Sequence, residues 1–239
     1  MLAKKHLSYL ILIFLLSCPT IAFSETLYFR VSPEAKGHTE AIKKVAILFV
    51  DLEIYQFTAG GVREPREDWI EAARRNFSAS LEEELKGRSI EAKVLGEESA
   101  SEELDDVLTL YKAVRGAILT HAYGNSLNFS FFPEKLNHFE YSLGPLEGLL
   151  TQLQVDGLLL VTAGDEISTG GRKALMVVGA FTGVHPRSGV TWANAALVDS
   201  SGSILWFSAN PGKSYDLREA GEVSTLVGRM LNGFPVTKK

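Results

Sequence analysis

The sequence predicts an α/β domain built as a layered mixed sheet, with a parallel βαβ half and a C-terminal antiparallel hairpin, flanked by helices. The predicted elements follow the order strand, helix, strand, helix, helix, strand, hairpin, helix, an alternation that packs helices against a sheet. Residues 45–50 and 158–161 are continuous apolar runs, typical of strands buried on both faces. Of 239 residues, 46% are hydrophobic and 22% are charged, which indicates one folded domain and not a disordered chain.

The first 24 residues have the pattern of an export signal. Lys4 and Lys5 form a positive start, and the apolar stretch 7–16 follows. That stretch has about ten residues, whereas a membrane-spanning helix needs ~20. The pattern therefore indicates that residues 1–24 are a cleaved signal peptide and not a permanent membrane anchor. We expect the mature protein outside the cytoplasm, either as an outer-membrane lipoprotein facing the periplasm or as a soluble periplasmic protein.

Two cleavage sites fit the end of this signal. Residues 15–18 resemble the lipobox of bacterial lipoproteins, which would make Cys18 the lipidated first residue and the membrane anchor. Residues 22–24 have the small-x-small spacing that ordinary signal peptidase prefers. Both alternatives stay open. Because Cys18 is the only cysteine, the sequence excludes intrachain disulfides and cysteine-based zinc sites.

The predicted domain spans residues 44–235, and a tether or irregular lead-in at 25–43 precedes it. Its first strand is the apolar run 45–50. Residues 67–86 predict a helix, because apolar side chains recur at every fourth position, namely Trp69, Ala73, Phe77, Leu81 and Leu85. Residues 90–94 alternate apolar and charged side chains, as a half-exposed strand does.

Three more helices follow farther along the chain. Ser99 and Glu102 resemble a capping box, and apolar residues at helical spacing continue from there toward Gly124. Residues 145–153 predict a short helix that opens with a proline. Residues 219–232 predict the closing helix, since their apolar side chains share one face.

Two insertions and a hairpin complete the predicted domain. The insertion at 125–143 is aromatic and irregular, and the one at 172–190 is apolar and rich in glycine. Residues 191–198 and 204–207 predict two antiparallel strands. The connection 199–202 begins with Asp and ends with Gly, which matches a type I turn.

Three short segments carry a family resemblance. They are the opening strand 44–48 (KVAIL), the strand entry 155–159 (VDGLL) and the hairpin 196–206 (ALVDSSGSILW). They resemble the fold shared by the curli-secretion-channel lipoproteins, the TolB amino-terminal domain and several small outer-membrane lipoproteins, over residues 44–232. The resemblance implies an envelope scaffold, a regulator of wall-building enzymes or an oligomeric secretion channel. It implies no catalytic residue, because the shared features are core and turn positions.

The sequence gives few signs of catalysis or nucleic-acid binding. With 24 Lys and Arg against 29 Asp and Glu, the net charge is −5, so we expect no nucleic-acid partner. Residues 212–214 are Gly-Lys-Ser, but the glycine that a P-loop needs five positions earlier is Phe207. The five histidines have no metal-ligand spacing, and no G-x-S-x-G motif occurs. We therefore expect no metal, no cofactor and no enzymatic activity.

Asp165 and Glu166 are the residues that suggest catalysis, so a hydrolase stays among the alternatives. They follow the second buried strand, and carboxylates at the carboxyl end of a strand are where α/β proteins gather ligands. A glycosidase pair needs a defined separation across a sugar, which neighbouring residues do not guarantee. The favoured interpretation is a solvated loop.

Two regions are candidates for contact with a partner. Residues 54–61 put Tyr55 and Phe57 on a glycine-containing loop, where aromatic side chains either form a recognition surface or cap the core. Residues 174–184 contain no charge and include Val178, Gly179 and Gly183. This stretch is a buried core segment, a contact with a partner or a second subunit, or a membrane-inserting element.

The favoured function is a non-enzymatic bacterial cell-envelope lipoprotein that acts as a protein-binding or self-assembling accessory module. Its partner would be another envelope protein or a second copy of the chain, with a lipid anchor if Cys18 is modified. A subunit of an outer-membrane secretion channel is the first alternative, with residues 125–143 and 172–190 as its membrane elements. A periplasmic hydrolase is the second.

Overall fold

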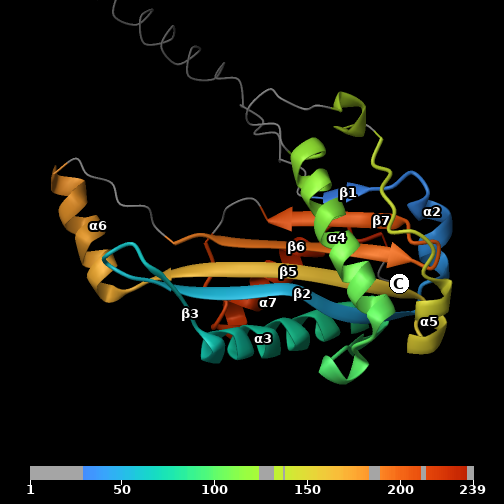
Figure 1. Ribbon diagram of the computed structural model, residues 1–239, viewed down its shortest axis with the longest axis horizontal. Helices are drawn as coiled ribbons and strands as arrows, with labels where there is room; N and C mark the ends of the chain where they lie inside the picture. Colours follow the sequence, from blue (N-terminus) through green and yellow to red (C-terminus); the bar gives the residue numbers. More distant parts are fainter. Residues whose placement is uncertain (1–28, 124–131, 137, 183–188, 211–213, 236–239) are drawn as a thin grey trace, which may run out of the picture.

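The computed structural model describes residues 29–123, 132–136, 138–182, 189–210 and 214–235 (Figure 1). These residues form one mixed sheet with helices on both of its faces, so the predicted α/β class is confirmed. The signal segment 1–24 with Cys18 lies outside the described residues, and so does Gly183.

The described sheet has seven strands in the order β1-β7-β6-β5-β2-β3, and β4 also pairs with β2. The bounds are β1 Phe29–Val31, β2 Lys44–Phe57, β3 Arg63–Pro65, β4 Glu91–Val94, β5 Gly157–Ser168, β6 Thr191–Asp199 and β7 Ile204–Asn210. β2 pairs in parallel with β4 and β5, and all other described pairings are antiparallel. The parallel half and the hairpin β6–β7 match the prediction.

The longer helices cover the two faces of this sheet, except for α6. Their bounds are α2 Ala35–His38, α3 Glu67–Lys86, α4 Glu102–His121, α5 Glu147–Leu153, α6 Gly170–Thr182 and α7 Ala220–Met230. Short 3-10 turns lie at Thr39–Ala41, Glu97–Ser99 and Pro133–Leu136. α6 lies at one end of the molecule, beyond the sheet (left in Figure 1). Among the described helices, none combines the length and the apolar character that crossing a membrane requires.

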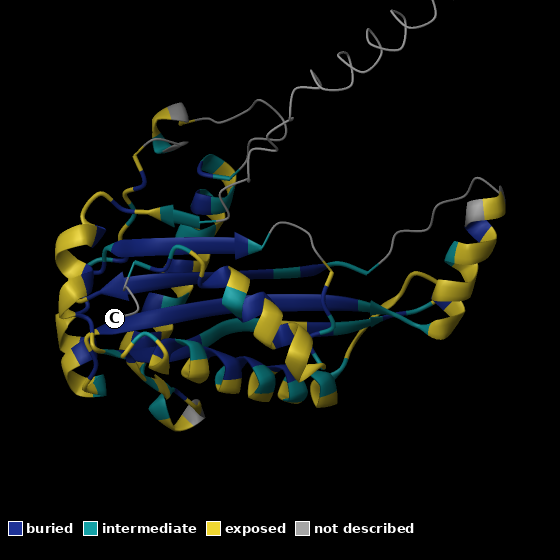
Figure 2. Ribbon diagram, turned by 180° about the vertical axis from the view of Figure 1, so that it is seen from behind, coloured by how far each residue is buried: buried dark blue, intermediate teal, exposed yellow. Residues whose placement is uncertain are grey.

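The two faces of the sheet bury separate apolar clusters, because successive side chains of a strand point to opposite faces. The face under α3 and α7 buries Ile47, Leu159, Phe77, Leu81, Leu226 and Trp206. The face under α4 and α5 buries Leu48, Leu158, Leu160, Val107, Tyr111 and Phe207. Figure 2 shows the strands of this double core as a buried band. The predicted stripe on α3 is correct, since Ala73, Phe77, Leu81 and Leu85 are buried.

β2 and β5 are both longer than the sequence predicted. They pair in parallel from Val45 opposite Gly157 to Phe57 opposite Ser168, with a bulge between Phe49 and Asp51. The prediction ended β2 at residue 50 because the polar residues that follow interrupt the apolar run. In the structure these polar positions continue the ladder, so the two strands extend together toward α6.

Two other boundaries differ from the prediction. Residues 29–42 were expected within a tether, yet β1 pairs with β7, and Ala35 and Ile42 are buried. The reason is that β7 would otherwise be an open edge, and a short strand closes it. α4 is capped by Ser101 and not by Ser99, because the Ser101 hydroxyl accepts a hydrogen bond from the backbone N–H of Leu104.

The insertion at 125–143 is only partly described, since residues 124–131 and 137 lie outside the described part. Of the described remainder, Pro133–Leu136 is a 3-10 turn and Ser142 forms a bridge with Ser203. Phe139 and Leu143 are buried against the α4 face of the sheet. The end of this insertion therefore belongs to the core of the domain.

Candidate interaction surface on helix α6

α6 carries a row of exposed apolar side chains. Val177 is 62% exposed, Val178 is 58% exposed and Phe181 is 87% exposed. These positions share one side of the helix because residues three and four apart are neighbours on its surface. The buried-core interpretation of residues 174–184 is therefore wrong for the described part, which ends at Thr182. Hydrophobic residues of this size gathered on a projecting helix are candidates for contact with a partner.

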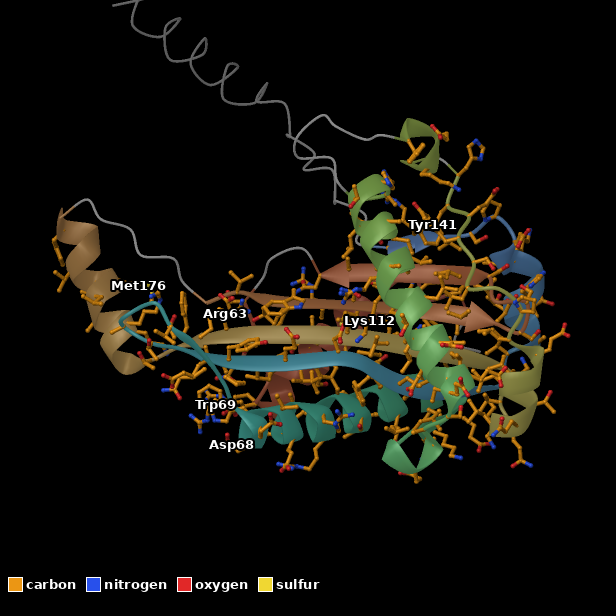
Figure 3. The ribbon with its side chains drawn as sticks, in the orientation of Figure 1. Arg63, Asp68, Trp69, Lys112, Tyr141 and Met176 are labelled. Carbon is orange, nitrogen blue, oxygen red and sulfur yellow. The ribbon has the colours of Figure 1, made fainter. Side chains whose placement is uncertain are left out.

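Leu175 and Met176 widen this apolar surface. Leu175 is 45% exposed, and Met176 lies on α6 at the end of the molecule, as Figure 3 shows. Val62, in the connection between β2 and β3, is 55% exposed at the same end. Gly179 is buried, so it does not belong to the exposed row, and Gly183 lies outside the described residues.

The first turn of α6 is fixed to the end of β2. Arg172 is buried, and its guanidinium carbon lies 3.5 Å from the centroid of the Phe57 ring. Its Nη1 donates a hydrogen bond to the carbonyl oxygen of Thr58 at 3.2 Å. The backbone N–H of Thr169 donates to the carbonyl oxygen of Phe57. The structure thus joins two regions that the sequence suggested separately as contact candidates.

Tyr55 and Phe57 lie in β2 and not on the predicted loop. Phe57 is buried beneath Arg172, and Tyr55 is half-buried with the guanidinium of Arg63 4.3 Å from its ring centroid. Arg63 in turn pairs with Glu166, at 3.0 Å between Nε and Oε1. Phe57 therefore supports the base of α6, whereas the Tyr55 ring contacts Arg63.

The carboxylates Asp165 and Glu166 are buried within β5, so the solvated-loop interpretation is wrong. As successive residues of a strand they point to opposite faces of the sheet. Glu166 meets Arg63, whereas Asp165 contacts Thr191 and the backbone N–H of Leu217. Two carboxylates on opposite faces cannot flank one glycosidic bond, which removes the geometric basis for a hydrolase at this pair.

Asp165 belongs to a compact buried network. The Thr191 hydroxyl lies 2.7 Å from the carbonyl oxygen of Tyr215 and 3.0 Å from Oδ1 of Asp165, and it accepts from the N–H of Tyr215 at 2.9 Å. A hydroxyl has one proton, so the Thr191 hydroxyl divides its donation between the carbonyl oxygen of Tyr215 and the carboxyl of Asp165. Burial raises the pKa of Asp165 to about 6, so this carboxyl is protonated below that pH and ionised above it.

The described residues do not assemble a metal site. No group of three or more His, Cys, Asp or Glu side chains there could hold an ion. His38 instead pairs with Asp199, at 2.5 Å between Nδ1 and Oδ2. Of the Gly-Lys-Ser segment at 212–214, only Ser214 falls within the described part.

A groove at the edge of β2 was not predicted from the sequence. It has a volume of about 390 Å³ and opens where β4 has ended, between α3 and α4. Its lining combines apolar side chains with one base and one acid, namely Leu48, Phe49, Leu95, Leu104, Leu108, Arg74 and Asp105. The contributing segments lie far apart in the sequence, so only the folded chain brings them together.

Comparison with known proteins gives only weak structural likenesses. No protein-family model matches the chain, and no curated protein matches it. Among solved structures, the PelC dodecamer from Paraburkholderia phytofirmans is similar at 12% sequence identity and a TM-score of 0.35, covering 82% of this chain and 89% of that one. A PelC variant with one substitution, also a dodecamer from that organism, gives the same values. A likeness at this TM-score carries no argument about function.

Proposed function

We propose that this protein is a non-enzymatic component of the bacterial cell envelope that works by protein contact through α6. The observation that carries the proposal is the exposed apolar row of Val177, Val178 and Phe181 on a helix held away from the core. The export pattern of residues 1–24 supports an extracytoplasmic location, with a lipid anchor if Cys18 is modified.

The geometry of α6 suits a docking element. Complete burial of one valine or phenylalanine side chain contributes ~1.5–3 kcal/mol, so three such side chains provide a substantial part of a binding energy. The clamp of Arg172 on Phe57 fixes the start of the helix in advance. A docking element that is already ordered loses less conformational entropy when it binds, which favours affinity.

A photo-crosslinking amino acid placed at position 177 or 181 tests this proposal in cells. We expect defined protein adducts from both positions in envelope preparations. Position 71 is the matched control, because Glu71 is exposed on a different helix, α3. Adducts that contain only lipid, or the same adducts from position 71, would contradict protein contact through α6.

A second measurement separates contact from folding. Phe181→Asp changes a side chain that is 87% exposed, so the thermal unfolding midpoint should stay close to that of the wild type. The crosslinks from position 177 should disappear in this variant. Retention of the crosslinks in a folded Phe181→Asp protein would show that the apolar row is not the contact surface.

A further inference from the structure

We propose that the surface that receives α6 is the groove at the β2 edge of a second copy of this chain, so that copies join head to tail. This inference rests on the proposed function, because it requires α6 to be a docking element. It adds the identity of the partner and the position of the acceptor site.

The acceptor groove has an apolar floor and an open mouth. Leu48 comes from β2, and Leu104 and Leu108 come from the first turns of α4. β4 pairs with β2 only as far as Ile47, and β3 begins to pair with it at Tyr55. The stretch of β2 between these two pairings has no described strand on its outer side, which leaves the groove accessible.

The volume of the groove, about 390 Å³, is enough for a few apolar side chains and too small for a folded domain. A projecting helix with one apolar row is therefore an occupant of suitable shape. α6 presents such a row in Val177, Val178 and Phe181.

The charges on the two sides of the proposed contact are also complementary. Lys173 is exposed one turn before Val177 on α6. Asp105 lines the groove, and Glu102 and Glu103 share the first turn of α4 with it. Arg74 also lines the groove, but its guanidinium lies over the Phe49 ring, 5.3 Å from the centroid. An acidic helix start next to an apolar groove fits a partner that carries a lysine just before its apolar row.

The occupant must come from another molecule. Arg172 fixes the start of α6 to the end of β2, beyond the sheet, whereas the groove opens farther back along the same strand. Because helix and groove are different patches, the contact is heterologous, and repetition produces a ring or a filament. Reversible association of this kind should depend on protein concentration.

The test uses sedimentation velocity on the exported protein and on two variants that each damage one half of the contact. Phe181→Asp damages the helix, and Ala100→Trp fills the groove from an exposed position in its lining. We expect the wild type to form larger species as its concentration rises, and each variant alone to remain monomeric. Mixed together, the two variants should form a dimer and nothing larger, since one supplies an intact groove and the other an intact α6.

A charge exchange provides the second arm. Lys173→Glu and Asp105→Lys should each weaken self-association, roughly tenfold at low salt, and the double exchange should restore it. Glu71→Trp is the control for an added surface tryptophan, because Glu71 does not line the groove. Circular dichroism confirms that each variant is folded before it is compared.

The failure of this inference can be told from the failure of the proposed function. A wild type that stays monomeric, while position 177 still crosslinks to another envelope protein, overturns the second copy as partner and keeps α6 as the contact surface. Self-association that survives Ala100→Trp but not Phe181→Asp overturns the groove as acceptor. A mixture of the two folded variants that contains only monomers overturns the head-to-tail arrangement.

Discussion

The guanidinium carbon of Arg172 lies 3.5 Å from the centroid of the Phe57 ring, which joins the first turn of α6 to the end of β2. Phe57 and Arg172 are 115 positions apart in the sequence, and the parallel pairing of β2 with β5 brings them together. A buried cation over an aromatic face contributes about 2 kcal/mol when water is excluded. This contact fixes the base of α6 and leaves its apolar row exposed.

Replacement of Arg172 by alanine should loosen α6 without unfolding the domain. The variant loses the contact with Phe57 and the hydrogen bond to Thr58, so the amides of α6 should exchange with deuterium faster than in the wild type. Lys173→Ala is the matched control, because Lys173 is exposed and adjacent. Equal exchange of α6 in both variants would show that Arg172 does not anchor the helix.

The stability of the protein should depend on pH through Asp165. Burial raises the pKa of this carboxyl from 3.8 to about 6, so the folded protein holds the proton more tightly than the unfolded chain. The stabilisation is complete below the unfolded pKa of 3.8 and is lost as the pH rises through about 6. We expect this group to lower the free energy of unfolding by ~3 kcal/mol across that window.

Asp165→Asn isolates this effect, because asparagine imitates the protonated acid. Its Nδ2 donates to the Thr191 hydroxyl, and its Oδ1 accepts from the N–H of Leu217. Urea unfolding at several pH values should give equal stabilities below about pH 4 and a more stable variant above pH 6. A variant that is less stable than the wild type above pH 6 would contradict a raised pKa of Asp165 in the folded protein.

Gly202 should not tolerate a side chain. Its φ is +81°, and a Cβ there would lie 1.7 Å from the backbone oxygen of Gly144. Gly202→Ala should therefore lower the free energy of unfolding by ~2 kcal/mol or more, since both the backbone and the neighbouring segment must shift. Gly116→Ala in α4 has open space around the added Cβ and should raise stability by ~0.5–1 kcal/mol. Chemical denaturation of both variants should show that their free energies of unfolding change in opposite directions.

The N-cap of α4 distinguishes Ser101 from the predicted Ser99. Ser101→Ala removes the acceptor of the Leu104 N–H and should cost ~1 kcal/mol of stability. Ser99→Ala should change the free energy of unfolding by less than about 0.5 kcal/mol, because Ser99 lies in the preceding 3-10 turn and does not cap α4. If the Ser99 variant is the less stable of the two, Ser99 is the N-cap of α4, as the sequence pattern predicted.

Periodic patterns were sufficient to predict several elements. The every-fourth spacing that includes Phe77 and Leu81 predicted α3 over residues 67–86, and α3 spans Glu67–Lys86. The turn signature at 199–202 predicted the β6–β7 hairpin, whose Gly202 N–H donates to the carbonyl oxygen of Asp199. These patterns report local geometry, which repeats every two or 3.6 residues wherever the chain folds.

The ends of β2 and β5 could not be predicted in the same way. Asp165 and Glu166 looked like loop residues because carboxylates are rarely buried. Their burial depends on Thr191, Leu217 and Arg63, which come from other parts of the chain. A polar residue inside a strand is stable only when such partners exist, and no local pattern shows them.

The sequence by itself determined the α/β class, the paired strands of the hairpin and the apolar stripe of α3, but not β1, β3 or α6. Only the tertiary structure decided which apolar segments are covered and which are exposed. The uncharged run that includes Val178 could have the same sequence in a buried core or on a projecting helix. The hydrophobic effect favours burial of such side chains, but it does not specify which surface covers them. The anchoring of Arg172 on Phe57 and the groove beside Leu108 depend on contacts between distant segments, so they exist only in the folded chain.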